Sequence, residues 1–435
     1  MKKMVYCFTI CMAILLLSSP TLVHAQKDVS DLKETVIKQS EMIDMLMGKV
    51  KALEEKKYTD VGAMPSSLEQ IAPKAAWAER MKIKGDFRYR HEIIDAEGRR
   101  HNTTQAERDS RATVRNRQRI RARVALHAEI NEDIDFIFQL ATGSASPTGT
   151  NQTLDTFFES KNVYVDLAYV IWHPEEFFSV NTKGFEMYAG KMKNPFYSTA
   201  DSEMIWDADV RPEGIAGTYT TKINCVELVG TVGGFWVDEQ ERDVDVNLWG
   251  IQGYFKAPVI TDGVKLVGGM TYYDYGAIQD HPIYTASGNS THLKVLDPAV
   301  RYQLDYQILE GFTELHWDMF EMPWVVYGQF VGNMSTKDDD NGFQFGVKLN
   351  KCKKPGSWEF QYFYRRLEAD AVLGALNDAD FGGGGTDNKG HGLKAGYQLS
   401  KNTRLNSALL LARSGLEDYA RKDHTVFQID LNFKF

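Results

Sequence analysis

Five arginines recur at every second position in the middle of one short segment of this 435-residue chain. A spacing of two places all five side chains on the same face of a β-strand. Guanidinium groups stay charged at any working pH and offer two donors at once to carboxylates or phosphates. The stripe therefore predicts contact with anions. Its members are Arg115, Arg117, Arg119, Arg121 and Arg123.

A second basic stripe comes just before the first. Lys84, Arg88 and Arg90 alternate with apolar residues such as Ile83 and Phe87. If the two segments pair as neighbouring strands, both stripes form one basic wall. In the alternative interpretation, acids on neighbouring strands or on an inserted loop neutralise this wall. Both interpretations can hold, because a paired arginine still shapes the electric field.

Four acids surround Trp206 further along the chain: Asp201, Glu203, Asp207 and Asp209. One interpretation is an acidic surface loop. The other is a loop folded opposite the basic wall, which would create a constriction with a transverse field. The sequence leaves both open.

Sites for catalysis or metal binding are not indicated. No zinc-ligand spacing, nucleophile elbow or Ser/His/Asp set stands out, so we expect no enzyme, no metal and no cofactor. Four glycines, Gly382 to Gly385, indicate a flexible outer loop, not a phosphate cradle. Cys225 and Cys352 remain after removal of the N-terminus described next, and their spacing does not decide whether they pair.

The N-terminus has the features of a secretory signal peptide, which we assign to residues 1–25. Lys2 and Lys3 precede an apolar stretch, and small residues stand at Val23 and Ala25 before the expected cleavage point. Cleavage would change the formal net charge from -9 to -11. This acidic balance argues against a nucleic-acid partner.

Residues 26–56 are predicted to form an α-helical coiled coil in the periplasm, followed by a linker over residues 57–81. Four heptads support the coiled coil, and a single amphipathic helix lying on the rest of the protein is the alternative. The a positions are Val29, Val36, Ile43 and Val50, and the d positions are Leu32, Gln39, Leu46 and Leu53.

From residue 82 to residue 435 the apolar pattern has a period of two. In the last segment Phe427, Ile429 and Leu431 point one way, while Gln428 and Asp430 point the other. Mean hydropathy is only -0.37, as expected where lipid-facing and lumen-facing residues alternate. Short and long connections also alternate. The prediction is an all-β fold, a transmembrane antiparallel β-barrel of about sixteen strands.

Eighteen strands are the alternative, because residues 276–309 could hide another pair. A barrel of sixteen strands leaves an aqueous channel, whereas eight strands would be filled by side chains. An arginine facing lipid at the bilayer midplane costs roughly 2–4 kcal/mol. The basic wall is therefore expected to face the lumen.

The chain resembles the bacterial "putative porin" family of outer-membrane barrels. The resemblance covers most of the chain after Trp77 and rests on moderately specific motifs. These are Lys84-Gly85-Asp86-Phe87-Arg88-Tyr89-Arg90, the arginines to Arg123, Leu140-Ala141-Thr142-Gly143, Thr150-Asn151-Gln152-Thr153-Leu154, Gly190-Lys191-Met192-Lys193-Asn194-Pro195-Phe196 and Trp206-Asp207-Ala208-Asp209. It implies a pore in the bacterial outer membrane, in contact with the lipid bilayer and lipopolysaccharide.

The layout of a coiled coil before a barrel is similar to that of trimeric anion-selective porins, which implies a homotrimer. The leading hypothesis is a water-filled channel for small anionic or polar solutes. A second is a structural protein whose coiled coil tethers the outer membrane to the peptidoglycan cell wall. A third, a barrel lipase, needs a Ser/His pair near the outer rim that the sequence does not offer.

Overall fold

The computed structural model describes residues 45, 48, 78–96, 114–241, 244–259, 263–294, 298–416 and 422–435. The chain divides into two units, Met1–Trp77 and Ala78–Phe435, and only the second is described in detail. The predicted signal peptide lies outside the described residues, as does the linker up to residue 77. Of the predicted coiled coil only Met45 and Gly48 are described, and both are helical.

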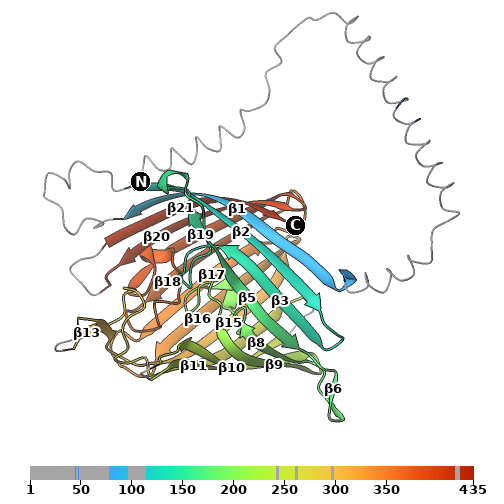
Figure 1. The fold of residues 1–435 in the computed structure, drawn as a ribbon, viewed down its shortest axis with the longest axis horizontal. Coiled ribbons are helices and arrows are strands. Elements are labelled where there is room, and N and C mark those ends of the chain that lie inside the picture. The colour runs from blue at the N-terminus through green and yellow to red at the C-terminus, as the bar shows by residue number, and fades with distance from the viewer. Residues whose placement is uncertain are drawn as a thin grey trace, which may run out of the picture. The chain divides into compact units, whose positions relative to one another are not determined.

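Sixteen strands form one closed antiparallel barrel (Figure 1). Each strand pairs with its neighbour in the chain, and the last strand, β21, pairs with the first, β1. Closure removes the unpaired edge that lipid would not tolerate. The barrel strands are β1 (Met81–Ala96), β2 (Val114–Glu129), β3 (Ile134–Thr142), β5 (Val163–Trp172), β8 (Phe185–Lys191), β9 (Glu213–Ile223), β10 (Val226–Asp238), β11 (Val246–Pro258), β12 (Lys265–Gly276), β15 (Tyr306–Met319), β16 (Met322–Asn333), β17 (Asn341–Asn350), β18 (Trp358–Leu367), β19 (Asn388–Ser400), β20 (Thr403–Ser414) and β21 (Lys422–Lys434).

The predicted count of sixteen is confirmed, and the alternative of eighteen is wrong. The segment 276–309 does contain two extra strands, β13 (Thr291–Leu293) and β14 (Val300–Tyr302). They form a separate hairpin outside the barrel sheet. Strands of three residues are too short for the barrel, because crossing a bilayer takes about 9–11 residues.

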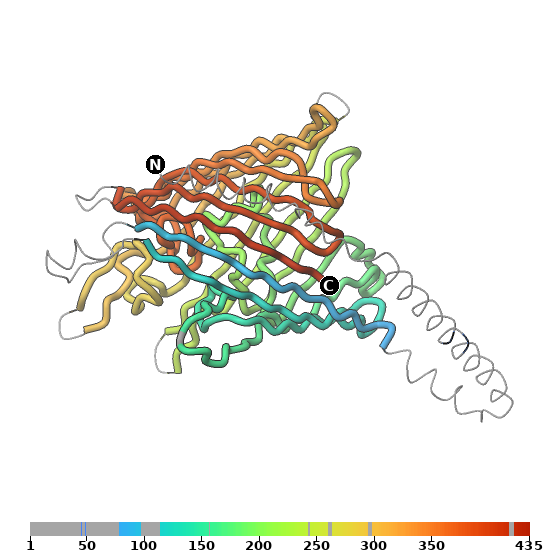
Figure 2. Tube along the Cα trace, turned by 90° about the horizontal axis from the view of Figure 1, so that it is seen from above, coloured from blue at the N-terminus to red at the C-terminus, as the bar shows by residue number. Residues whose placement is uncertain are grey.

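The two ends of the barrel differ in the length of their connections (Figure 2). At one end, where the C-terminus lies, several turns have only two residues, such as 224–225 and 320–321. Cys225 and Cys352 lie in two different turns at this end, and both are free thiols. A twelve-residue connection there carries a small hairpin of β6 (Glu176–Phe177) and β7 (Val180–Asn181).

The opposite end carries the long loops. Four of them include short elements, which are β4 (Gln152–Thr153), η2 (Thr156–Phe158), η3 (Thr199–Asp201), the β13–β14 hairpin and η4 (Phe381–Gly383). No helix in the described part of the chain is both long and apolar enough to cross a membrane.

Apolar side chains cover the outer face of the barrel, whereas many inward positions are polar. In β16, Val326 and Phe330 point out and are 46% and 50% exposed, while Gln329 between them points in and is buried. In β11, outward Trp249 and inward Gln252 show the same contrast. This is the inverse of a water-soluble protein, and it follows from the alternation of side chains along each strand when the outer solvent is lipid.

The closing strand follows the predicted alternation. Asp430 is buried inside the barrel, and Phe433 lies on the outer face against Phe87 of β1, with ring centroids 6.3 Å apart. Phe435 and Gly85 exchange two backbone hydrogen bonds of 3.0 Å. The chain therefore ends within the seam that closes the barrel.

Candidate functional site

The basic wall is built by two adjacent strands, as the sequence predicts. In the register of β1 with β2, Arg88 stands opposite Arg121 and Arg90 opposite Arg119. Because alternate residues of a strand share a face, this register brings the two stripes together. Lys84 and Arg115 are exposed and lie towards opposite ends of the wall.

Carboxylates on β1 and β21 pair with most of these arginines. Asp86 binds Arg121 at 3.0 Å and Arg123 at 2.8 Å. Asp430 holds Arg90 through two hydrogen bonds of 2.7 and 2.9 Å. Glu92, fully buried, pairs with Arg117. The alternative interpretation, a wall neutralised by neighbouring acids, therefore describes most of its members.

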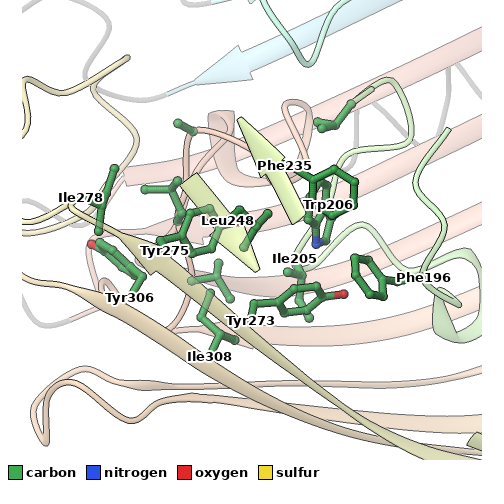
Figure 3. Close-up of a cluster of buried hydrophobic side chains, with 14 of the residues drawn as sticks. Phe196, Ile205, Trp206, Phe235, Leu248, Tyr273, Tyr275, Ile278, Tyr306 and Ile308 are labelled. Carbon is green, nitrogen blue, oxygen red and sulfur yellow. The ribbon is translucent and has the colours of Figure 1, made fainter. Parts of the chain in front are cut away.

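The long loop over residues 192–212 folds into the barrel (Figure 3). Phe196 and Trp206 are buried against Tyr273 of β12, with ring centroids 5.2 and 5.9 Å apart. Tyr197 donates a hydrogen bond of 2.8 Å to Glu314 of β15. Of the two interpretations of this acidic segment, the inserted loop is the one observed.

The four acids of this loop do not form one face opposite the arginines. Only Asp209 faces the basic wall, with an oxygen 3.9 Å from Arg121 and a hydrogen bond from the hydroxyl of Thr150. The remaining acids have partners elsewhere in the barrel interior. Asp201 binds Lys348 at 2.6 Å, Glu203 lies 3.5 Å from Lys394, and Asp207 accepts a hydrogen bond from the backbone of Ala379.

A second loop, residues 368–387, also folds inside and meets the first. The backbone amide of Asp378 donates to the carbonyl of Glu203 at 3.0 Å. Asp380 reaches the basic wall and binds Arg90 at 3.1 Å. Gly382–Gly385, which the sequence places in a flexible outer loop, belong to this inserted loop. All four have positive φ, and a Cβ at Gly385 would lie 2.2 Å from the carbonyl of Ser287.

Sequence reasoning missed several charged residues of the interior. They share one signal that could have revealed them, an inward register among outward apolar residues of a strand. Arg365 of β18, for example, is buried and binds Asp378 at 3.0 Å. The others are Lys348 of β17, Lys394 of β19 and Arg404 of β20.

Between the basic wall and the inserted loops lies a polar cavity of about 800 Å³. Ten basic and eight acidic side chains line it. The basic ones are Arg88, Arg90, Arg117, Arg119, Arg121, Lys348, Lys351, Lys353, Lys394 and Arg404, and the acidic ones are Asp201, Glu203, Asp207, Asp209, Glu359, Asp378, Asp380 and Asp430.

Loop carboxyl groups differ in their affinity for protons. Burial, together with the charge of nearby Asp378, raises the pKa of Glu203 despite Lys394. Burial and the charge of Glu203 likewise raise the pKa of Asp207, to about 9. Burial opposes ionisation of Asp380 too, but the Arg90 charge lowers its pKa to about 2. Asp380, beside the basic wall, therefore stays charged at neutral pH, whereas Asp207, further away, holds on to its proton.

A closed barrel of sixteen strands, apolar outside and polar within, with a loop folded into its interior, has the architecture of a porin. The chain belongs to the family described as "Putative porin", whose model matches residues 63–301 and 305–435. It is thus an outer-membrane porin, and family and fold point to a channel rather than an enzyme.

One solved structure supports the fold. The chain is similar to OprB of Pseudomonas putida, with a TM-score of 0.53 and 10% identity over 83% of this chain and 96% of that one. It is also similar to a triple mutant of Rhodopseudomonas blastica porin, with a TM-score of 0.43 and 11% identity over 82% of this chain and 100% of that one. The comparison with curated proteins found no match.

Proposed function

We propose that this porin is a diffusion channel for small hydrophilic solutes that passes anions better than cations. The observation that supports this most is the lining of the polar cavity, where ten basic side chains face eight acidic ones. The raised pKa of Asp207 lowers the effective number of negative charges further at neutral pH. Positive charge is thus in excess along the path that a solute would take.

A modest excess of positive charge has a large effect on ion selectivity when it lines a narrow lumen. Low-dielectric walls focus the field of lining charges into a narrow aqueous lumen and raise the local concentration of counter-ions. Salt screens exposed charges within about 8 Å at physiological ionic strength, a distance comparable to that across a narrow constriction. The anion preference should therefore weaken as salt is raised.

The test is the reversal potential of the purified protein in planar bilayers under a gradient of KCl. Wild type should favour chloride. The double variant Arg121→Gln/Arg123→Gln removes two positive charges and leaves Asp86 unpaired, so its preference should fall furthest. The matched triple variant, which adds Asp86→Asn, should have a chloride preference between those of wild type and the double variant. A cation-selective wild type, or three equal reversal potentials, would overturn the anion preference.

The second candidate, a structural tether, has one observation in its favour. The two inserted loops share a buried apolar cluster with the inner wall, which fills part of the lumen. Of the coiled coil that would bind peptidoglycan, only Met45 and Gly48 are described. A purified barrel that inserts into the bilayer but carries no current would favour the tether over the channel.

A further inference from the structure

Three buried hydrogen-bond donors in or beside the basic wall have no acceptor among the described residues. They are Nε of Arg88, Nε of Arg119 and Nδ2 of Asn432. A buried donor without an acceptor is costly, and native proteins rarely leave one so. Three at one place indicate that something else supplies the acceptors.

The three residues lie close together. Asn432 stands directly opposite Arg88 in the register of β21 with β1. Arg88 and Arg119 both donate to Asn151, one to its side-chain oxygen and the other to its carbonyl at 3.4 Å. Asn151 is held there because β4, the two residues that follow it, pairs with β2. Both arginines and Asn151 line the polar cavity.

Neighbouring carboxylates are already engaged by other arginines. Asp86 is shared by Arg121 and Arg123, and Asp430 is held by both arms of Arg90. Arg88 comes no closer than 3.8 Å to Asp430. Arg119 has no carboxylate within 4 Å in the described parts of the chain. These two guanidinium groups are therefore the ones free to take an external acceptor.

Charge indicates how many negative charges that acceptor carries. Six arginines of the basic wall face five carboxylates of the strands and inserted loops, an excess of one positive charge. The arginines are Arg88, Arg90, Arg117, Arg119, Arg121 and Arg123, and the acids are Asp86, Glu92, Asp209, Asp380 and Asp430. One negative charge balances this set.

We propose that Arg88, Arg119 and Asn432 form a binding subsite for the carboxylate group of a small organic acid. The two oxygens of a carboxylate accept about four hydrogen bonds and match the planar fork of a guanidinium. The subsite rests on the proposed function, because the acid must reach it through the lumen. It makes the channel a selective path for monocarboxylates instead of a passive one for chloride.

The experiment measures block of chloride current by sodium acetate in single channels. In wild type, acetate should lower the conductance in a saturable manner. Arg119→Gln should weaken the apparent affinity about tenfold, the loss expected for a hydrogen bond to a charged group. Lys337→Gln, an equal loss of charge in an exposed connection, should leave the block unchanged.

A second variant keeps the subsite testable even if Arg119→Gln fails to fold. Asn432→Asp places a carboxylate beside Arg88 while keeping both arginines, so it should occupy the subsite and abolish the block. Resistance of each barrel to protease is checked before recording. Phosphate at pH 8, mostly a dianion, should block more weakly than acetate, and stronger block would overturn the assignment to a single charge.

The two hypotheses fail in different ways. A wild type that carries no current, or prefers cations, overturns the proposed function. A conducting, anion-selective wild type that acetate does not block overturns only the subsite. If acetate blocks wild type, Arg119→Gln and Asn432→Asp equally, the subsite is likewise overturned while the proposed function stands.

Discussion

Glu203 and Asp207, two acids of the inserted loop, bind a proton more tightly than exposed carboxyl groups do. Their pKa values are raised by burial and by nearby negative charge, that of Asp207 to about 9. Two backbone amides, those of Asp209 and Ala379, donate to Asp207 and keep it in place in either state. At neutral pH the loop is therefore less acidic than its sequence indicates.

Raising the pH should reduce the preference for anions. Between pH 7 and about 9.5 Asp207 loses its proton and adds a negative charge to the cavity lining. The ratio of chloride to potassium permeability, measured from reversal potentials, should fall over this range. Asp207→Asn cannot ionise and should flatten the profile. A profile as steep in this variant as in wild type would assign the change to another group.

The same carboxyl group links stability to pH. Its pKa in the folded barrel lies above the ordinary value, so the unfolded chain releases the proton at lower pH than the folded one does. Stability should therefore fall as pH rises from about 4 towards 9. Melting of the detergent-solubilised barrel, compared with that of Asp207→Asn, measures this contribution. The variant should lose less stability over the same range.

At the scale of single elements, the short strand β8 depends on one glycine. Gly190 has a φ of +124°, and a Cβ there would lie 2.3 Å from the carbonyl of Ala168 on the adjacent strand β5. Gly190→Ala should therefore lower the free energy of unfolding by more than about 1 kcal/mol. Gly253 of β11 has open space around it, so Gly253→Ala is the control and should change little. Denaturant unfolding in detergent distinguishes the two, and equal losses would contradict the backbone argument.

The inserted loop 192–212 depends on its aromatic contacts. Truncating a buried tryptophan costs about 3–5 kcal/mol, so Trp206→Ala should detach the loop from Tyr273 without opening the barrel sheet. Single-channel recordings should show larger current fluctuations than wild type, at nearly the same barrel melting temperature. Trp249→Ala, which removes an outward-facing ring, should leave the current fluctuations as small as in wild type. A Trp206→Ala channel whose current fluctuates no more than that of wild type would show that other contacts hold the loop.

Elements differ in how far the sequence predicts them. The strands were predictable, because alternation of residues such as Phe427 and Gln428 determines register and facing within one segment. The contacts inside the barrel were less predictable from the sequence. Asp380 and Arg90 meet across 290 positions, and no local pattern encodes that contact. The inward fold of the loop 368–387 was not predictable for the same reason, since Gly385 packs against Ser287 of another loop.

At the scale of the whole molecule, the oligomeric state stays a prediction. The heptads of residues 29–53, together with the layout of coiled coil and barrel, favour a homotrimer. Deleting residues 27–56 should therefore convert trimers to monomers in mild detergent, as measured by native mass spectrometry, while each barrel keeps its conductance. An intact chain that is monomeric under the same conditions would contradict the prediction.

The seam between β1 and β21 also determines when the molecule can form. Arg90 and Asp430, paired across this seam, are 340 residues apart in the chain. The first strand is synthesised early and its partner last, so every incomplete chain has two unpaired edges, each a template for aggregation. Contacts of such long range also make folding slow. The newly exported chain must therefore be kept from aggregating until its final residues arrive, and a chain truncated before β21 cannot close.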